Sequence, residues 1–335
     1  MINAIFFICY FGTIFLLILY YQRISQILKL IDKPSKKKIH KKPTPLIGGV
    51  IIFFLLIEIF AFQYSNYWKN LDIIILITIC FLCFIIGLID DRINIKSYLK
   101  LFIVFIILLF LLNFSELLVL QILYFKIFDK ILNLGSYGIY FTILSILLLI
   151  NAYNLSDGIN GLAIIISIHW IIALFFFTFN IKIENLLIPL STLIIIGFFI
   201  YKGKFFLGDS GTLLVSSLIG LTTIYSYNSK LQIDYTTLSA ENIFLIFIIP
   251  GLDMFRLFIE RIFRKKDPLS GDTNHLHHLL VKNYKLNKTL LIYSIILCLP
   301  FYANYFLYDK EIYITLFTMV LYFYTIYFLK KNHKS

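Results

Sequence analysis

The chain has 335 residues, of which 60% are hydrophobic and only 14% are charged, and its formal net charge at pH 7 is +12. A soluble protein of this length needs more polar surface than this composition supplies, so we exclude that class. Apolar runs of about 18 to 22 residues recur from end to end, which is the length a helix needs to cross roughly 30 Å of hydrocarbon. The alternating segments of about ten residues that are typical of a transmembrane barrel do not appear in the sequence. The sequence therefore predicts an all-α, polytopic integral membrane protein, with one membrane-embedded domain over residues 1–335.

Ten or eleven membrane-spanning helices are expected along the chain. The expected ranges are 4–21, 48–64, 72–89, 99–120, 139–153, 159–179, 185–201, 211–228, 241–260, 288–308 and 311–329. The first range lacks a basic segment before it and a small-residue cleavage site after it, so we do not expect a cleaved signal peptide.

The positive charge is distributed unevenly between the two sides of the expected membrane. If the connecting segments alternate sides, 24 of the 30 Lys and Arg residues fall on one side. This bias predicts that the basic side is cytoplasmic and that the N-terminus lies outside. The net charge therefore indicates topology and contact with anionic lipid headgroups rather than binding of nucleic acid.

All four cysteines fall inside apolar ranges. Cys80 and Cys83 have the C-x-x-C spacing of redox and zinc sites, but no polar residues surround them in the sequence. We expect them to be inert, small apolar residues rather than a redox or zinc pair.

Unusual polar clusters occur in five different loops, all on the side predicted to be cytoplasmic. They are "DKPSKKKIHKKPTPLIGG" at 32–49, "GLIDDR" at 87–92, "NAYNLSDGINGL" at 151–162, "FFLGDSGT" at 205–212, and a segment at 253–278 that ends in "HLHH". The loops of the other side hold nothing comparable. Five polar clusters on one face predict a single site formed by cytoplasmic loops.

The chemistry of these clusters favours a metal ion together with phosphate. Asp90, Asp91, Asp157 and Asp209 are expected at or just inside helix ends, where burial of a carboxylate is costly unless a cation neutralises it. Mg²⁺ typically takes one or two carboxylates plus substrate phosphates. The glycines beside these acids let backbone N–H groups approach an anion closely. Any one of the motifs alone is equally compatible with a helix end or a turn, and only their joint occurrence indicates a site.

The "HLHH" stretch admits zinc binding or phosphate binding. Neighbouring residues of a helix point about 100° apart, so His277 and His278 cannot easily share one metal ion, although His275 and His278 could share a face. Imidazoles and Arg261, which lies on the same segment, would supply hydrogen bonds and positive charge to phosphate oxygens. We therefore favour phosphate over zinc.

Taken in order, the five motifs resemble the polyprenyl-phosphate N-acetylhexosamine-1-phosphate transferases over about residues 32–280. The "HLHH" form is similar to the undecaprenyl-phosphate N-acetylglucosamine-1-phosphate transferases that begin the synthesis of cell-surface polysaccharides. The resemblance implies that the protein transfers an N-acetylhexosamine-1-phosphate, with GlcNAc-1-phosphate first among the alternatives, from a UDP-sugar to polyprenyl phosphate, and that UMP is released. It also implies a multi-pass protein of the bacterial inner membrane that requires Mg²⁺ or Mn²⁺ and for which a homodimer is one alternative.

The resemblance assigns roles to residues of this sequence. Asp90, Asp91, Asp209 and His278 are the expected catalytic residues, and Asp209 and Asp91 are the expected metal ligands. The expected substrate-binding residues are Lys33, His40, Lys42, Asn154, Asp157, Asn160, Arg261, His275 and His277. Relatives often carry aspartate at the position of Asn160, so a metal role there is not expected, and a different sugar is an alternative.

Two other classes of protein remain as alternatives. A transporter is expected to have charged residues near the bilayer midplane and related halves with broken helices. An intramembrane metalloprotease is expected to carry H-E-x-x-H within a span. The sequence shows neither pattern, so the transferase is the primary prediction.

Overall fold

The computed structural model describes residues 2–34, 42–63, 70–177, 183–231, 238–267, 273–307 and 309–332, and it is mostly helical, as predicted. The helices are α1 (Ile2–Leu19), α2 (Tyr21–Ile27), α3 (Gly48–Gln63), α4 (Leu71–Ile93), α5 (Ser97–Leu111), α6 (Gly138–Ser156), α7 (Leu162–Phe177), α8 (Ile183–Tyr201), α9 (Gly208–Leu231), α10 (Ala240–Phe263), α11 (Leu276–Asn283), α12 (Leu286–Phe306) and α13 (Glu311–Asn332). Two small antiparallel pairs join them, β1 (Ile31–Asp32) with β2 (Thr44–Pro45), and β3 (Ile122–Phe125) with β4 (Lys130–Asn133).

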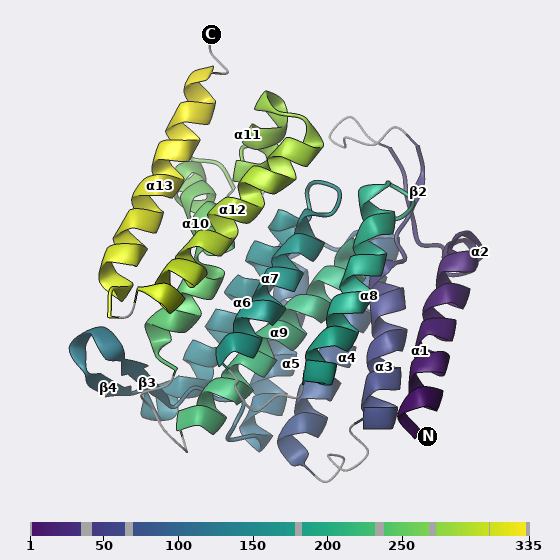
Figure 1. Cartoon of the computed structure of the whole chain (residues 1–335), viewed down its shortest axis with the longest axis horizontal. Coiled ribbons are helices and arrows are strands. Elements are labelled where there is room, and N and C mark those ends of the chain that lie inside the picture. Colours follow the sequence, from purple (N-terminus) through teal and green to yellow (C-terminus); the bar gives the residue numbers. More distant parts are fainter. Residues whose placement is uncertain are drawn as a thin grey trace.

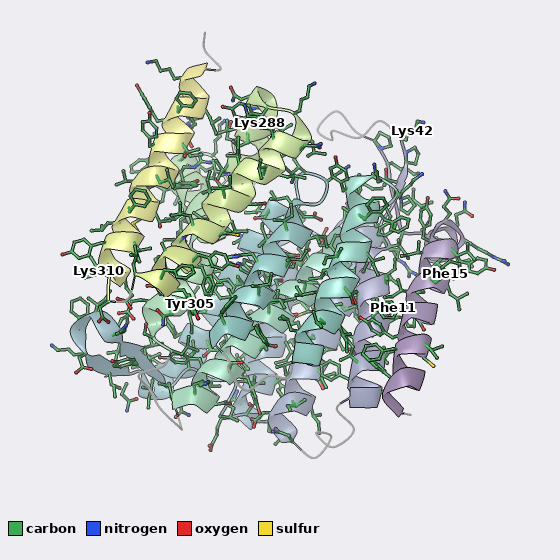
Figure 2. The ribbon with its side chains drawn as sticks, in the orientation of Figure 1. Phe11, Phe15, Lys42, Lys288, Tyr305 and Lys310 are labelled. Atoms are coloured by element: carbon green, nitrogen blue, oxygen red, sulfur yellow. The ribbon has the colours of Figure 1, made fainter. Side chains whose placement is uncertain are left out.

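Each expected membrane span corresponds to one of these helices, but the count of ten or eleven spans is not confirmed. By length and composition, six described helices can cross a membrane, or seven if α1 and α2 form one span bent by 69°. Helices α3, α7 and α8 are apolar but shorter. Side chains such as Phe11 and Phe15 of α1 project outward from the bundle, where lipid would surround them (Figure 2). The described helices therefore support a polytopic membrane protein without establishing how many helices cross.

The prediction for 99–120 is wrong in its second half. Helix α5 ends at Leu111, and the Ser115 hydroxyl donates to Asp72 Oδ1 at 2.5 Å and accepts from the Leu118 backbone N–H at 3.1 Å. The chain then forms the β3–β4 hairpin, which the sequence analysis did not anticipate. A short apolar run has the same composition in a helix and in a strand, so hydrophobicity alone cannot locate this boundary.

Helix α9 is the least apolar of the expected spans and lies in the middle of the bundle, packed against α3, α4 and α6 (Figure 1). Two of its hydroxyl groups are satisfied within the helix itself: Ser216 Oγ donates to Thr212 O at 2.5 Å, and Ser217 Oγ donates to Leu213 O at 2.7 Å. Small hydroxyl residues therefore occupy the interior at little cost and let neighbouring helices approach closely.

Glycines bring α3 and α4 onto the start of α9. A Cβ added to Gly87 would lie 2.4 Å from the Cα of Ser210, and a Cβ added to Gly49 would lie 2.2 Å from the backbone N of Gly211. Any larger residue would push these helices apart. The close approach places the end of α4, which carries Asp90 and Asp91, against the start of α9.

The two ends of the bundle differ. Figure 1 shows α2, β2 and α11 at one end with the C-terminus, and the β3–β4 hairpin and the N-terminus at the opposite end. Lys42 and Lys288 lie at the first end (Figure 2). The segments that carry the predicted site residues are therefore gathered at the end that the hairpin does not occupy.

Candidate active site

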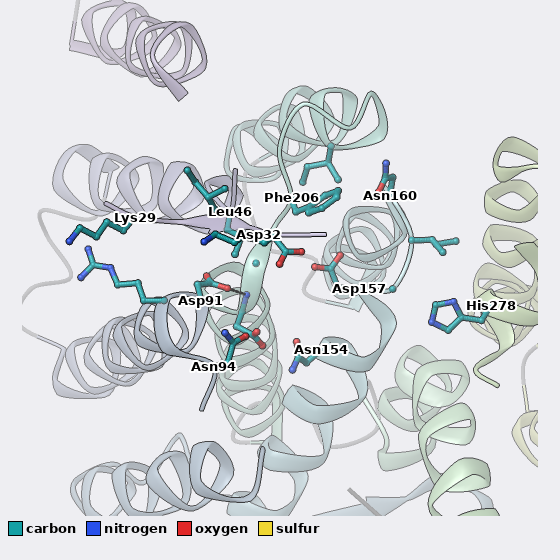
Figure 3. A pocket seen from close by; sticks show the side chains of 18 of the residues that line it. Lys29, Asp32, Leu46, Asp91, Asn94, Asn154, Asp157, Asn160, Phe206 and His278 are labelled. Carbon is teal, nitrogen blue, oxygen red and sulfur yellow. Dashed lines mark hydrogen bonds between the residues drawn. The ribbon is translucent and has the colours of Figure 1, made fainter. Parts of the chain in front are cut away.

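A cavity with a volume of about 1240 Å³ opens at the end of the bundle that carries α2 and α11. All five polar clusters contribute to its wall, the fifth through His278 at the start of α11, and Figure 3 shows side chains from them pointing into the same space. The predicted site residues that line it are Lys33, Asp91, Asn154, Asp157, Asn160, Asp209 and His278. The structure thus brings together residues that lie far apart in the sequence, from Lys33 to His278.

A buried lysine joins two of the predicted catalytic carboxylates. Lys100 Nζ donates to Asp90 Oδ2 and to Asp209 Oδ1, both at 2.7 Å. The side chains of Lys100 and Asp90 are 8% and 7% exposed, whereas that of Asp209 is 31% exposed at the cavity wall. Asp90 also accepts from the Ile95 backbone N–H at 2.6 Å. Asp90 therefore lies behind the cavity and holds Lys100, and Asp209 faces the cavity.

Asp91 fixes the start of α9. Its Oδ1 accepts from the backbone N–H of Asp209 at 2.7 Å, and its Oδ2 accepts from that of Ser210 at 3.0 Å. Gly208 has φ +77°, and a Cβ there would lie 2.8 Å from Asp91 Oδ2. A carboxylate from another helix thus caps α9, where the helix dipole favours negative charge.

The loop between α6 and α7 forms another wall of the cavity. Asn154 Oδ1 accepts from Thr212 Oγ1 at 3.0 Å, which ties this loop to α9. Burial raises the pKa of Asp157 well above its usual range, and the negative charges of Asp209 and Asp91 raise it further. The cavity therefore concentrates negative charge that a cation would relieve.

The "HLHH" segment is anchored by Asp253 of α10. Nδ1 of His275 donates to Asp253 Oδ2 at 2.8 Å, and the Leu276 backbone N–H donates to Asp253 Oδ1 at 3.0 Å. Asp253 also accepts from Tyr322 Oη at 2.6 Å and from Arg256 Nη2 at 3.0 Å. His275 is 3% exposed and does not line the cavity. His275 therefore anchors the "HLHH" segment to α10.

The other two histidines lie against the loop between α6 and α7. A Cβ added to Gly158 would come within 2.3 Å of His277 Nε2 and 3.0 Å of His278 Nε2. His277 is 1% exposed, and within the described part of the chain neither of its ring nitrogens has a hydrogen-bond partner. Burial lowers the pKa of His277 well below its usual range, and the neighbouring His278 lowers it further. Of the three histidines, only His278 reaches the cavity.

The remaining predicted residues have different positions. Arg261 is 6% exposed and does not line the cavity, so the structure does not place it with the phosphate-binding candidates. Lys42 is exposed and also lies outside the lining, whereas Lys33 belongs to it. His40 lies outside the described residues.

Sequence reasoning missed Lys100 and Asp253 as individual residues. Both are charged residues inside apolar ranges, at 99–120 and 241–260, and an ionisable residue within a membrane span is by default a functional candidate. That signal was available in the sequence. Asp32 and Phe206 also line the cavity without having been predicted as site residues.

The cavity offers oxygen ligands rather than a complete protein cage for a metal. Within the described ranges, no three His, Cys, Asp or Glu side chains form a metal-binding group. Mg²⁺ does not need such a group, because it is commonly held by one or two carboxylates plus substrate phosphates and water. Asp209, at the cavity wall and half-buried, fits that requirement. The arrangement does not favour the tight, all-protein geometry of a structural zinc site.

Comparison with known proteins agrees with the motifs. Residues 73–227 match the model of glycosyl transferase family 4. The chain is 28% identical over 285 residues to the undecaprenyl-phosphate alpha-N-acetylglucosaminyl 1-phosphate transferase of Escherichia coli (strain K12), covering 81% of this chain and 74% of that protein. It is 27% identical over 269 residues to the Thermotoga maritima protein of the same name, covering 79% and 77%. The resemblance predicted from the motifs is confirmed: residues 73–227 match the model of glycosyl transferase family 4, and the chain is similar to these sugar-phosphate transferases over about four-fifths of its length.

Proposed function

We propose that the protein transfers GlcNAc-1-phosphate from UDP-GlcNAc to undecaprenyl phosphate and releases UMP. The observation that carries the proposal is the convergence of Asp91, Asn154, Asp157, Asp209 and His278 on one cavity. The names of the relatives support the same reaction. The product, a polyprenyl diphosphate that carries the sugar, serves a first membrane step of cell-surface polysaccharide synthesis.

The reaction exchanges one phosphoanhydride for another. An oxygen of the lipid phosphate forms a bond to the β-phosphorus of the UDP-sugar, and the bond from that phosphorus to the α–β bridging oxygen breaks. UMP leaves with the bridging oxygen and its electron pair. A dianionic lipid phosphate needs no base, because the attacking oxygen carries no proton. The protein's task is therefore positioning and charge stabilisation, as in phosphoryl transfer generally.

The charged residues divide that task. Lys100 holds Asp209 in place and places a positive charge behind the carboxylates, which lowers the cost of gathering them near a phosphate. Asp91 acts through α9, because it fixes the backbone at Asp209 and Ser210. His278, at the other wall, is placed to donate a hydrogen bond to a phosphate oxygen or to the sugar.

We propose Mg²⁺, with Mn²⁺ as an alternative, as the cofactor. Asp209 would hold it together with substrate phosphate oxygens, and Asp91 contributes through its contacts with the backbone of α9. When bound, the ion supplies positive charge that neutralises the diphosphate and the leaving UMP. The carboxylates of Asp91, Asp157 and Asp209 on one cavity support a site for a cation.

The size and lining of the cavity suit two substrates. Its volume of about 1240 Å³ exceeds the roughly 300–1,000 Å³ of ordinary small-molecule sites. The half-buried ring of Phe206 offers a flat apolar surface to a nucleobase, and Asn154 and Asn160 offer amide groups to it or to the ribose. Asn160, at the same wall, is the residue we expect to influence which N-acetylated sugar is accepted.

We also propose that the cavity faces the cytoplasm of a bacterium and that the N-terminus lies outside. The gathering of Lys42, Lys288 and the polar segments at one end of the bundle supports this orientation, because cytoplasmic loops carry an excess of Lys and Arg. UDP-sugars are cytoplasmic, so the donor would reach the cavity directly. A homodimer is compatible with this arrangement, as is a monomer.

The test is release of UMP from UDP-GlcNAc by purified protein, with and without undecaprenyl phosphate and Mg²⁺. UMP that forms only when lipid and metal are both present supports the proposal. Release from another UDP-N-acetylhexosamine instead would keep the reaction and replace the sugar. If protein that elutes as a single species in detergent releases no UMP from any such donor, the proposal is overturned. The transporter would then be the favoured alternative.

A further inference from the structure

The cavity lining carries basic residues as well as acidic ones. Lys29, Lys33 and Arg92 line it and are called the basic ledge, with Asp32 and Asp91 as their direct neighbours in the sequence. In Figure 3, Lys29 and His278 lie at opposite edges of the cavity. Nothing in the proposed handling of the donor uses Lys29 or Arg92.

The ledge is built by the end of α2 and the end of α4. Arg92 Nε donates to the carbonyl oxygen of Leu28 at 2.8 Å, which joins the two helix ends beside Lys29. Arg92 follows Asp91 directly, so the ledge begins one residue from the carboxylate that fixes α9. The Arg92 end of the ledge is therefore tied to the end of α2.

Lys29 occupies a backbone conformation that normally favours glycine. Its φ is +57°, and the turn that ends α2 is closed by the Leu30 backbone N–H, which donates to Ser25 O at 2.8 Å. Glycine is the usual residue at such a helix end, and a residue with a Cβ is uncommon there. A cationic side chain kept at a strained position beside a cavity indicates a function rather than a stabilising role.

Exposed isoleucines lie beside the ledge residues in the sequence, and one of them, Ile31, also lines the cavity. Ile27, Ile31 and Ile93 are 70%, 38% and 69% exposed, and each lies within two residues of a ledge residue in the sequence. Helix α2 is bent by 69° from α1, as expected for a segment that lies along the membrane surface. A positively charged ledge with an apolar border matches an amphiphile with an anionic head and a hydrocarbon tail.

The charges of the two substrates decide which one the ledge takes. The donor's diphosphate binds together with a divalent cation, which suits the part of the cavity around Asp157 and Asp209. The acceptor's phosphate monoester carries no metal of its own and would be repelled by those carboxylates, so it needs fixed positive charge. An ordinary phospholipid headgroup shares this phosphate chemistry, but the ledge lines the reaction cavity itself.

We propose that Lys29, Lys33 and Arg92 form the docking site for the phosphate of the polyprenyl acceptor, whose chain leaves the cavity beside Ile27, Ile31 and Ile93. This inference rests on the proposed transferase reaction and names the place where its lipid substrate binds. It assigns α2 as the side of the protein from which the acceptor reaches Asp209.

The variants that test the ledge are Lys29→Gly and the double change Lys33→Gln with Arg92→Gln. Lys29→Gly removes the charge and also relieves the positive φ, so the melting temperature should not fall. Both variants should raise the KM for undecaprenyl phosphate about tenfold, because each removes charged hydrogen-bond donors from the phosphate, and should leave the KM for UDP-GlcNAc within about twofold. Lys288→Gln, an exposed lysine at the same end of the bundle, is the matched control and should change neither KM.

Two further measurements separate the outcomes. Direct binding of a short-chain polyprenyl phosphate, in the absence of any UDP-sugar, should weaken in both variants. This measurement tests the ledge even if the protein turns over no UDP-sugar. The defect should persist in vesicles of phosphatidylcholine alone. An unchanged KM for undecaprenyl phosphate together with unchanged binding of the lipid phosphate would overturn the proposed role of the ledge. The proposed reaction would not be affected. An equal rise in both KM values would mean that the ledge binds the donor. A defect confined to vesicles with phosphatidylglycerol would mean that the ledge binds ordinary lipid headgroups. Either result would overturn the proposal.

Discussion

Lys100 Nζ of α5 lies 2.7 Å from Oδ1 of Asp209 at the start of α9, and the same ammonium lies 2.7 Å from Asp90 Oδ2 of α4. One buried cation therefore joins three helices directly behind the cavity. The arrangement explains how two carboxylates, Asp90 and Asp209, remain close together. It also makes Lys100 the residue on which the geometry of these two carboxylates depends most.

Replacement of Lys100 by Met should abolish activity and lower stability. It leaves the buried Asp90 carboxylate without its cation, which costs about 3–5 kcal/mol, and activity should fall at least about 100-fold. The double variant Asp90→Asn with Lys100→Met removes both charges, so it should recover most of the melting temperature in detergent and remain inactive. Recovery of activity in the double variant would show that Lys100 acts only in folding.

The Gly87→Ala change should separate α4 from α9. The new Cβ would lie 2.4 Å from Ser210 Cα, and such overpacking costs about 1–3 kcal/mol. Because Asp91 would shift relative to Asp209, UMP release should fall about tenfold or more. Gly251→Ala is the matched control, since a Cβ there meets nothing within 4 Å, and it should leave both the melting temperature and activity at or above wild type. Equal behaviour of the two variants would contradict the close packing.

Replacement of Asp253 by Asn should release the "HLHH" segment. The change weakens the anchor of His275 and leaves Arg256, which is 8% exposed, without its carboxylate, at a cost of about 3–5 kcal/mol. Hydrogen exchange at the Leu276 amide, which now donates to Asp253, should become faster. Tyr322→Phe removes a single hydrogen bond to Asp253, worth about 1 kcal/mol, and should leave exchange at Leu276 close to wild type. Slow exchange in Asp253→Asn would mean that other contacts hold the segment.

The stability of the protein should depend on pH through His277. Its pKa is lowered by burial, so below about pH 6.5 the unfolded chain binds a proton at this ring while the folded chain does not. Stability should therefore fall as the pH decreases from 7 to 5, by about 2 kcal/mol from this group. In His277→Leu, the melting temperature should fall less over the same range. Leu280→Val, a buried change in the same helix, should lower the melting temperature equally at both pH values, and equal slopes in His277→Leu and wild type would contradict the assignment.

The position of the helices and the chemistry of the site were largely predictable from the sequence. Apolar runs locate α4, α6 and α10 within a few residues, because the hydrocarbon thickness sets their length and burial of backbone polar groups demands helices. All five polar clusters line one cavity, the fifth through His278, because short loops on one side of a membrane are confined to one face. The β3–β4 hairpin was not predictable, since its apolar residues also suit a helix.

The roles within the site depended on tertiary structure. The sequence by itself predicted that Asp90, Asp91, Asp209 and the histidines lie near one site, because their motifs all fall on one side of the expected membrane. Only the tertiary structure decided that Asp90 pairs with Lys100, that Asp91 caps α9 and that His278 alone of the three histidines reaches the cavity. The physical reason is that these roles follow from distances of a few ångströms between helices far apart in the sequence, and those distances are fixed by packing at Gly49, Gly87 and Gly158 rather than by any local pattern.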